Sequence, residues 1–453
     1  MPNQQSSSSS NYDLEPGPVD QFDRKLKFKT QQSLEIDTTS YQSQIYGLDI
    51  QRIGWEVAIK RSRSHYRLER IKGYDKHGTE KNADESKPVG DLCDIEQKLH
   101  FPKEERSCFY SFRSNSRQTH CSFTHFQLRH LLATTSPTDV FYMNDYSIYH
   151  WNTITKTTEQ SNGKITIERK ILDLRKGHGV IKDLSYMGND QIPGILISTL
   201  NASFPYLAVG GFKGEIVITS LENEGEIIYN GRISSASNSI TNYMDIRGNT
   251  LLVSSNDGVV RKFDLPSMDL LSAVSFEYCI NNAAMQSQNG KLMAVIGDTY
   301  DVVVCDQEGT KSSMMKLKGH MDYSFALSWN PANEYQFATG SQDRLLCVWD
   351  IRRPSSPVYS IPAIIGAVRS VRYSEDGQFL ASAEPADFVH IYDVNSNFEK
   401  EQLLDFYGEI VGVDFSKKDG GKSLYVGIFD RQFKSLMEFS RFSSETTIDD
   451  IFI

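Results

Sequence analysis

Five cysteine and histidine residues lie close together in the sequence and form its only cluster of side chains that could bind a transition metal: Cys108, His120, Cys121, His125 and His130. Eleven residues separate the first two and none separates the next two. Zinc sites usually pair their ligands across a gap of about two to four residues, so this spacing matches no ordinary zinc pattern. Positions along alternating strands explain the cluster better, and no metal site is predicted.

No motif for catalysis stands out either. The sequence contains no phosphate-binding loop, dinucleotide fingerprint, nucleophile elbow or HExxH helix. The triplet at 177–179, Gly-His-Gly, indicates only a turn. We therefore predict a protein that is not an enzyme, with no catalytic residue and no cofactor.

The composition narrows the class of protein further. The 453 residues carry a net charge of −10, which argues against non-specific binding to nucleic acid or to anionic membranes. No apolar stretch approaches the roughly 18 residues needed to span a bilayer, and the start of the chain lacks the apolar core of a signal peptide. Six scattered cysteines without a CxxC pair suit a reducing compartment. We expect an intracellular protein, cytoplasmic or nuclear, that is a monomer by itself.

The chain divides into four zones by composition. Residues 1–41 are serine-rich and poor in large apolar residues, so we expect disorder. Residues 42–107 form a charged extension with helical patches. Residues 108–442 consist of short β-branched and aromatic runs separated by Gly, Asp, Asn and Ser, which predicts an all-β domain. Residues 443–453 are a short acidic tail.

The all-β zone has an internal repeat. A polar residue closes a short apolar strand at each of seven positions: Asn152, Ser220, Asp264, Asp306, Asp350, Asp393 and a weaker one near Met437. The intervals from Ser220 onward are 44, 42, 44, 43 and 44 residues. A period of about 40–45 residues with four strands per unit is typical of β-propellers. We therefore predict seven blades, with an insertion within 157–205 and a closing strand drawn from 109–126.

The unit at 319–350 resembles a WD repeat. His320, Asp343 and Trp349 have the spacing of the hydrogen-bonded relay of that repeat, and we name Ser341 as the fourth member. Thr339 is the alternative, which the spacing does not separate from Ser341. Buried polar groups must be paired, so a relay here is expected to stabilise the blade. The other blades lack the tryptophan and are expected to depend on apolar packing.

Much of the chain is similar to a family of uncharacterised WD-repeat proteins of fungi and plants. The stretches that carry this resemblance lie at 49–56, 66–70, 109–113, 125–129, 146–151, 319–325, 383–393 and 398–402. The resemblance implies a seven-bladed WD-repeat propeller with an N-terminal extension, and it implies no activity.

Two carboxylates stand where a blade does not require them. Glu384 and Asp387 flank Pro385, which removes a donor from the strand ladder. A break of local rules often marks a functional site, so we name both as partner-binding candidates; a bulge at the blade corner is the alternative. Tyr323, Phe325 and Arg369 follow the turns that reach the opening of a propeller and complete this set, with a core role for Phe325 as the alternative.

Arg352 follows Trp349 and Asp350 as in the WDxR pattern of propellers that serve as substrate receptors of cullin-type ubiquitin ligases. It is the candidate for binding a ligase adaptor. In the N-terminal extension, the basic run at 60–72 could bind an acidic partner or nucleic acid, with Trp55, Ile59 and Tyr66 along one helical face. A helix packed along the propeller with a solvated charged side is the favoured alternative.

These observations predict a scaffold or adaptor that binds other proteins of unknown identity through a rigid disc. A ubiquitin-ligase substrate receptor is the second hypothesis.

Overall fold

The computed structural model describes residues 50–51, 53, 55, 60–80, 99–103, 107–116, 119–158, 161–175, 194–223, 225–265, 267–286, 291–308, 314–430 and 434–442. The predicted disordered segment 1–41 and the acidic tail 443–453 lie outside these residues. Within the described part of the chain, no helix is long and apolar enough to cross a membrane.

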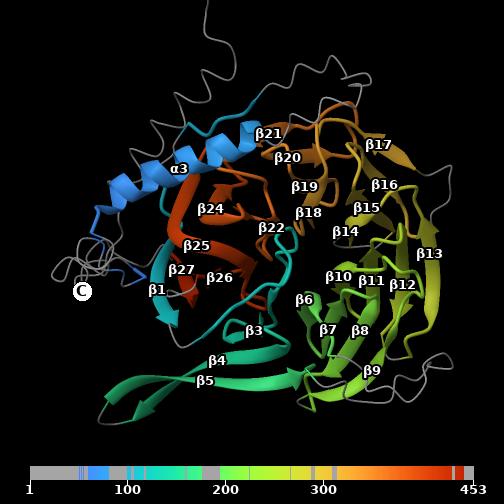
Figure 1. Ribbon diagram of the computed structural model, residues 1–453, viewed down its shortest axis with the longest axis horizontal. Coiled ribbons are helices and arrows are strands. Elements are labelled where there is room, and N and C mark those ends of the chain that lie inside the picture. The colour runs from blue at the N-terminus through green and yellow to red at the C-terminus, as the bar shows by residue number, and fades with distance from the viewer. Residues whose placement is uncertain are drawn as a thin grey trace, which may run out of the picture. The chain divides into compact units, whose positions relative to one another are not determined.

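Antiparallel four-stranded sheets arranged around an axis form the blades of a propeller (Figure 1). The first blade comprises β2 (Leu132–Thr134), β3 (Asp139–Asn144), β4 (Ser147–Thr158) and β5 (Ser161–Asp173). The second comprises β6 (Ile197–Ser203), β7 (Tyr206–Gly211), β8 (Glu215–Ser220) and β9 (Glu226–Arg232). The third comprises β10 (Thr241–Arg247), β11 (Thr250–Ser255), β12 (Val259–Asp264) and β13 (Leu270–Ser275). The fourth comprises β14 (Ile280–Met285), β15 (Leu292–Gly297), β16 (Val302–Asp306) and β17 (Met315–Leu317). The fifth comprises β18 (Ser324–Trp329), β19 (Gln336–Ser341), β20 (Leu345–Asp350) and β21 (Tyr359–Pro362).

The last two blades share one long strand. The strands β22 (Ser370–Tyr373), β23 (Phe379–Ala383), β24 (Ala386–Asp393), β25 (Glu401–Phe415), β26 (Ser423–Phe429), β27 (Ser435–Arg441) and β1 (Tyr110–Ser116) form a single sheet. The first half of β25 pairs with β24 and is the outer strand of blade six. Its second half, from Glu409, pairs with β26 and is the inner strand of blade seven. The described strands therefore make seven blades, as predicted.

The ring closes between the two ends of the β domain. Strand β1 pairs antiparallel with β27, from Tyr110 opposite Arg441 to Ser116 opposite Leu436. The closing strand therefore comes from the predicted region ahead of the first blade. Closure covers an edge that would otherwise expose unpaired backbone groups.

The polar residues that mark the sequence repeat lie at the ends of the third strands of the blades. Ser220, Asp264, Asp306, Asp350 and Asp393 each end the third strand of a blade. The first blade departs from this pattern because β4 and β5 extend into a long hairpin, which accounts for part of the predicted insertion. The rest, 176–193, lies outside the described residues.

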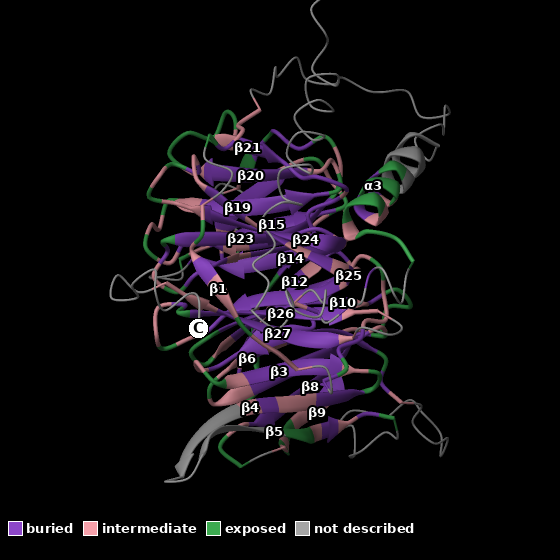
Figure 2. Cartoon of the chain, turned by 90° about the vertical axis from the view of Figure 1, so that its left-hand side faces the viewer, coloured by how far each residue is buried: buried purple, intermediate pink, exposed green. Residues whose placement is uncertain are grey.

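The core lies between blades, which explains why the strands read as nearly continuous apolar runs. All six residues of β8 are buried, because both faces of this strand are covered by adjacent blades. The outer strand β13 is mostly exposed. Figure 2 shows the same contrast between buried strands and exposed loops. Clusters such as Leu346 and Val348 of blade five with Val371 and Leu380 of blade six join neighbours around the ring.

The N-terminal extension contributes the helix α3 (Arg63–Glu80), which lies against one face of the propeller (Figures 1 and 2). We call this the top face. It carries the loops that enter the first strand of each blade and the loops that join second and third strands.

Candidate functional site: the top face

The hydrogen-bonded relay predicted for blade five is present, but one of its four residues differs from the residue that we named. The Trp349 indole Nε1 donates to Thr339 Oγ1 at 2.7 Å, and the same hydroxyl lies 2.7 Å from His320 Nε2. His320 Nδ1 lies 2.9 Å from Asp343 Oδ2, and Asp343 accepts from the backbone of Leu345. Thr339, and not Ser341, is therefore the fourth member. Both hydroxyls lie on the same face of β19, but that of Thr339 lies at the depth of the Trp349 indole, whereas that of Ser341 lies at the end of the strand.

Ser341 has a different role near the same loop. Its hydroxyl contacts the carbonyls of Asp322 and Tyr323 at 3.1 and 2.9 Å, and accepts from the Asp343 backbone. It therefore shapes the loop that enters blade five.

Glu384 does not lie on a surface. Its side chain is 1% exposed and accepts the backbone N–H groups of Ile364, Ile365 and Gly366 at 2.6, 2.6 and 2.9 Å. His390 bridges it to the buried Glu401 at 2.9 and 2.5 Å. The predicted surface role of Glu384 is therefore wrong, because the buried carboxylate stabilises the loop into blade six. The expectation that this blade depends on apolar packing alone is also wrong.

Glu384→Gln should destabilise the protein by roughly 1–3 kcal/mol, because an amide NH₂ group would face backbone donors that need an acceptor. Denaturant unfolding would measure the loss. Glu222→Gln, a change at an exposed position, is the control and should stay within about 0.5 kcal/mol of wild type. Equal stability of the two variants would contradict the role assigned to Glu384.

Asp387 is fully buried because helix α3 covers it. Arg67 Nη1 lies 2.8 Å from Asp387 Oδ2, and Arg70 Nε donates to the same oxygen. The Gly408 backbone donates to Asp387 Oδ1 at 3.1 Å. The φ angle of Asp387 is 70°, in the left-handed region that turns the chain into β24. Asp387 therefore binds the protein's own extension, and its predicted place on an exposed partner surface is wrong.

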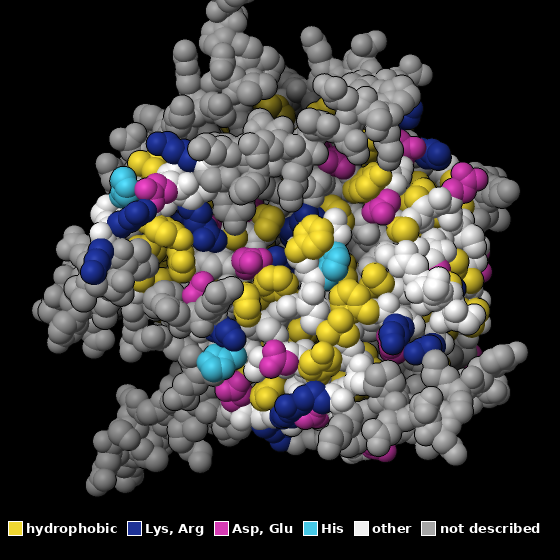
Figure 3. Space-filling view, in the orientation of Figure 1, with side chains coloured by type: hydrophobic (Ala, Val, Ile, Leu, Met, Phe, Trp, Pro, Cys, Tyr) yellow, Lys and Arg dark blue, Asp and Glu magenta, His cyan; other side chains and the backbone are white. Residues whose placement is uncertain are grey.

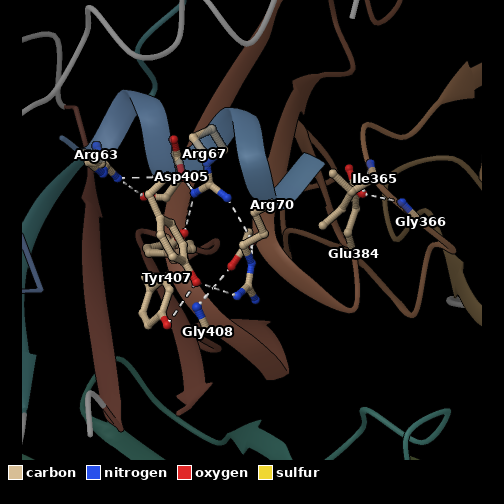
Figure 4. A network of polar contacts seen from close by, with 12 residues as sticks. Arg63, Arg67, Arg70, Ile365, Gly366, Glu384, Asp405, Tyr407 and Gly408 are labelled. Atoms are coloured by element: carbon tan, nitrogen blue, oxygen red, sulfur yellow. Dashed lines mark hydrogen bonds and ion pairs between the residues drawn. The ribbon is translucent and has the colours of Figure 1, made fainter. Parts of the chain in front are cut away.

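A second carboxylate, Asp405, completes this contact, which we call the helix clamp (Figure 4). Arg67 Nη2 donates to the Asp405 carboxylate and, at 2.5 Å, to the carbonyl of Phe406. Arg63 Nη2 donates to the Asp405 carbonyl at 2.8 Å. Burial and the neighbouring arginines lower the pKa of Arg67, while Asp387 opposes that change.

Aromatic rings extend the helix clamp. Trp55, Tyr66 and Tyr407 pack with ring centroids 5.1–5.6 Å apart, and the Tyr66 and Tyr407 hydroxyls lie 3.1 Å from each other. The helix therefore packs along the propeller, as the favoured alternative held. Its charged side is not solvated as that alternative expected, because Arg67 and Arg70 pair with buried propeller carboxylates. Trp55 lies outside α3, however, and Ile59 is outside the described residues.

Helix α3 leaves several large apolar side chains of the top face exposed. Phe126 is 63% exposed, Met321 57%, Tyr300 55% and Tyr323 38%. The Tyr300 and Tyr323 rings stack with centroids 6.3 Å apart across neighbouring loops. In Figure 3, hydrophobic side chains gather around the centre of this face, with basic and histidine side chains among them. We call these four residues the aromatic rim; of them, only Tyr323 was predicted.

The other two predicted candidates lie just beneath the rim. Phe325 is buried, as its alternative core role required, and the Arg369 guanidinium lies 4.1 Å from its ring centre. Arg369 is 5% exposed and donates to Gln342 Oε1 at 2.5 Å. Sequence reasoning therefore reached this region but did not separate exposed from buried positions.

Arg352 lies at the opposite end of the blade strands. Its side chain is exposed but donates to both Asp350 carboxylate oxygens, at 2.9 and 2.6 Å, and stacks on Tyr335. Nothing in this geometry favours an adaptor contact.

A cavity of about 190 Å³ lies along the ring axis, lined by the first strands of all seven blades. Three basic and three acidic side chains line it: Arg247, Arg372, Lys417, Asp245, Glu375 and Asp414. Their formal charges balance, which gives no argument for a charged ligand. Among the described residues, no group of three or more His, Cys, Asp or Glu side chains is placed to hold a metal ion.

Comparison with known proteins agrees with this architecture. The sequence model of the WD domain, G-beta repeat family matches residues 311–350, the segment that contains the relay. The chain is 32% identical over 80 residues to histone acetyltransferase type B subunit 2 of Neurospora crassa, covering 16% of this chain and 18% of the relative. It is 25% identical over 118 residues to the ribosome biogenesis protein WDR12 homolog of Culex quinquefasciatus, covering 26% and 28%. The matches thus span less than a third of these relatives.

Solved structures match over a larger part of the chain. A chain of the mitotic checkpoint complex aligns with a TM-score of 0.55 at 15% identity, covering 77% of this chain and 99% of that one. The WD40 β-propeller domain of Doa1 aligns with a TM-score of 0.55 at 13% identity, covering 74% and 98%. At these identities the likeness shows the fold. No finding supports the narrower fungal and plant family.

Proposed function

We propose that this WD-repeat β-propeller is a non-enzymatic scaffold that binds another protein through the aromatic rim of its top face. The observation that carries the proposal is the exposure of Phe126, Tyr300, Met321 and Tyr323 on a face that α3 covers only in part. Exposed aromatic and methionine side chains are enriched where proteins bind each other. The rigid ring holds them in place, because each blade is packed against its neighbours.

The relatives support the same class of function. Their names describe a subunit of an acetyltransferase and a factor in ribosome biogenesis, and one structural neighbour belongs to a checkpoint complex. Each name is compatible with a propeller that works inside an assembly. An intracellular location, nuclear or cytoplasmic, belongs to the proposal; the described cysteines are all free thiols, as in a reducing compartment. We do not propose a ligase receptor, since no observation favours it.

Affinity purification of the double variant Tyr300→Ala/Tyr323→Ala tests the proposal. Truncating two aromatic hot-spot side chains is expected to cost about 2 kcal/mol or more of binding free energy, so captured partners should fall at least tenfold. Quantitative mass spectrometry of the captured proteins is the measurement, and melting temperatures should match wild type within a few degrees.

Tyr335→Ala is the matched control, because Tyr335 has the same 38% exposure as Tyr323 but lies at the opposite end of the blade strands. It should leave the captured proteins unchanged. If the double variant captures the same proteins as this control, the aromatic rim is not the binding surface.

A further inference from the structure

Arg369 is a buried cation whose donors are not all used. Its side chain is 5% exposed, and its Nη2 donates to Gln342. Among the described residues, Nε and Nη1 have no hydrogen-bond partner. Leaving a buried charged group without partners costs free energy, and native proteins seldom do so without a functional reason. Stacking on Phe325 offsets only part of that cost.

The surroundings of Arg369 contain other basic groups. Repulsion from Arg369 and Arg129 adds to burial in lowering the pKa of His125, so the three side chains share one region. Arg129 is itself paired with Glu409 at 2.6 Å. Burial and Arg129 lower the pKa of Arg369 to about 9, so it keeps its charge at neutral pH.

Among the described residues, the carboxylate of Asp322 lies near enough to attract Arg369 without bonding to it. Asp322 opposes the decrease in the pKa of Arg369, but its Oδ1 accepts the Tyr323 backbone N–H at 2.7 Å instead. The region can therefore accept one further negative charge.

We propose that Arg369 binds the carboxylate of an aspartate or glutamate side chain from the partner segment that covers the aromatic rim. This inference rests on the proposed function and adds the chemistry of the partner: an acidic residue flanked by apolar residues. A carboxylate carries the single negative charge that one guanidinium balances, whereas a phosphate dianion would need a second free cation, and Arg129 is paired. Phe325 beneath and the rim above would exclude water and strengthen the ion pair. Nε and Nη1 have no exposed surface, so a rim side chain must turn aside, a common movement on binding.

Arg369→Met separates this role from a structural one. Removing a buried charge that lacks a counter-ion should leave the melting temperature unchanged or raise it, because apolar replacements of poorly compensated charges are often neutral or stabilising. Arg67→Met is the matched control, since Arg67 is equally buried but paired with two carboxylates, and it should lower the melting temperature. If both variants melt lower by similar amounts, Arg369 is structural and the proposal fails.

Binding is measured with two labelled peptides that differ only in charge, acetyl-Phe-Glu-Glu-Phe-amide and acetyl-Phe-Gln-Gln-Phe-amide, at up to millimolar concentrations. We expect the full-length protein to bind the glutamate peptide at least tenfold more tightly, and Arg369→Met to remove that difference. The glutamate peptide should also raise the pKa of His125, followed by NMR. Displacement of the peptide by equimolar inorganic phosphate would instead indicate a phosphate site.

The two proposals can fail separately. Equal affinity for both peptides, with loss of binding in Tyr300→Ala/Tyr323→Ala, would overturn the carboxylate site and keep the aromatic rim. Preference for glutamate that survives the tyrosine changes would keep the carboxylate site and overturn the rim. Absence of any preference at millimolar peptide contradicts the carboxylate site.

Discussion

We expect Arg67→Met to lower the free energy that is needed to separate helix α3 from the propeller by about 3–5 kcal/mol. The side chain joins α3 to Asp387, Asp405 and the Phe406 carbonyl, all in the protein interior. Methionine keeps the length of the chain but leaves two buried carboxylates with fewer counter-charges. Breaking a buried ion pair from one side is costly for that reason, whatever the net stability of the intact pair.

Hydrogen exchange should show which part of the protein loses stability in Arg67→Met. We expect faster exchange in 63–72 and 405–408, because the helix and the loop that it covers open together. Arg61→Met is the control: Arg61 is exposed and, among the described residues, pairs with Glu69, and a surface pair contributes at most about 1 kcal/mol. Unchanged protection of 405–408 in Arg67→Met would show that the helix is not held by this network.

Trp349→Ala should destabilise the propeller by roughly 3–5 kcal/mol. The indole is fully buried, packs against Phe337 and His320, and donates to Thr339 Oγ1. The substitution leaves a cavity and removes a hydrogen bond in the same blade. Thermal and denaturant unfolding would measure the loss.

Two milder variants separate the contribution of apolar packing from that of the hydrogen bond. Trp349→Phe keeps much of the apolar packing, and Thr339→Val keeps the shape of the hydroxyl-bearing side chain, so each should cost about 1–3 kcal/mol. A Trp349→Ala variant that melts within one or two degrees of wild type would refute the relay.

The blade count was predictable because a propeller repeats one structural unit, and Ser220, Asp264, Asp306, Asp350 and Asp393 end equivalent strands. The spacing of the WD-repeat relay also predicted the contact between His320 and Asp343. The choice between Thr339 and Ser341 was harder, since both point to the same side of β19. Only the depth of the indole between neighbouring blades separates them.

Glu384 and Asp387 show where prediction from sequence ended. Their departure from the usual blade residues was visible, but what covers them was not. Asp387 meets Arg67 from more than 300 positions earlier in the chain. The stretches 66–70 and 383–393, both part of the family resemblance, contain two halves of that one contact.

The sequence by itself determined the all-β propeller, its period, its closing strand and the turn that holds His320, because these depend on local alternation and on spacing along the chain. Only the tertiary structure decided which polar residues are buried and which aromatic residues stay exposed. Burial depends on what the docking of α3 and the packing of adjacent blades bring together. That is why Asp387, expected at a surface, holds the protein's own helix and Glu384 holds a loop of blade six. Phe126, Tyr300 and Met321, by contrast, remain exposed.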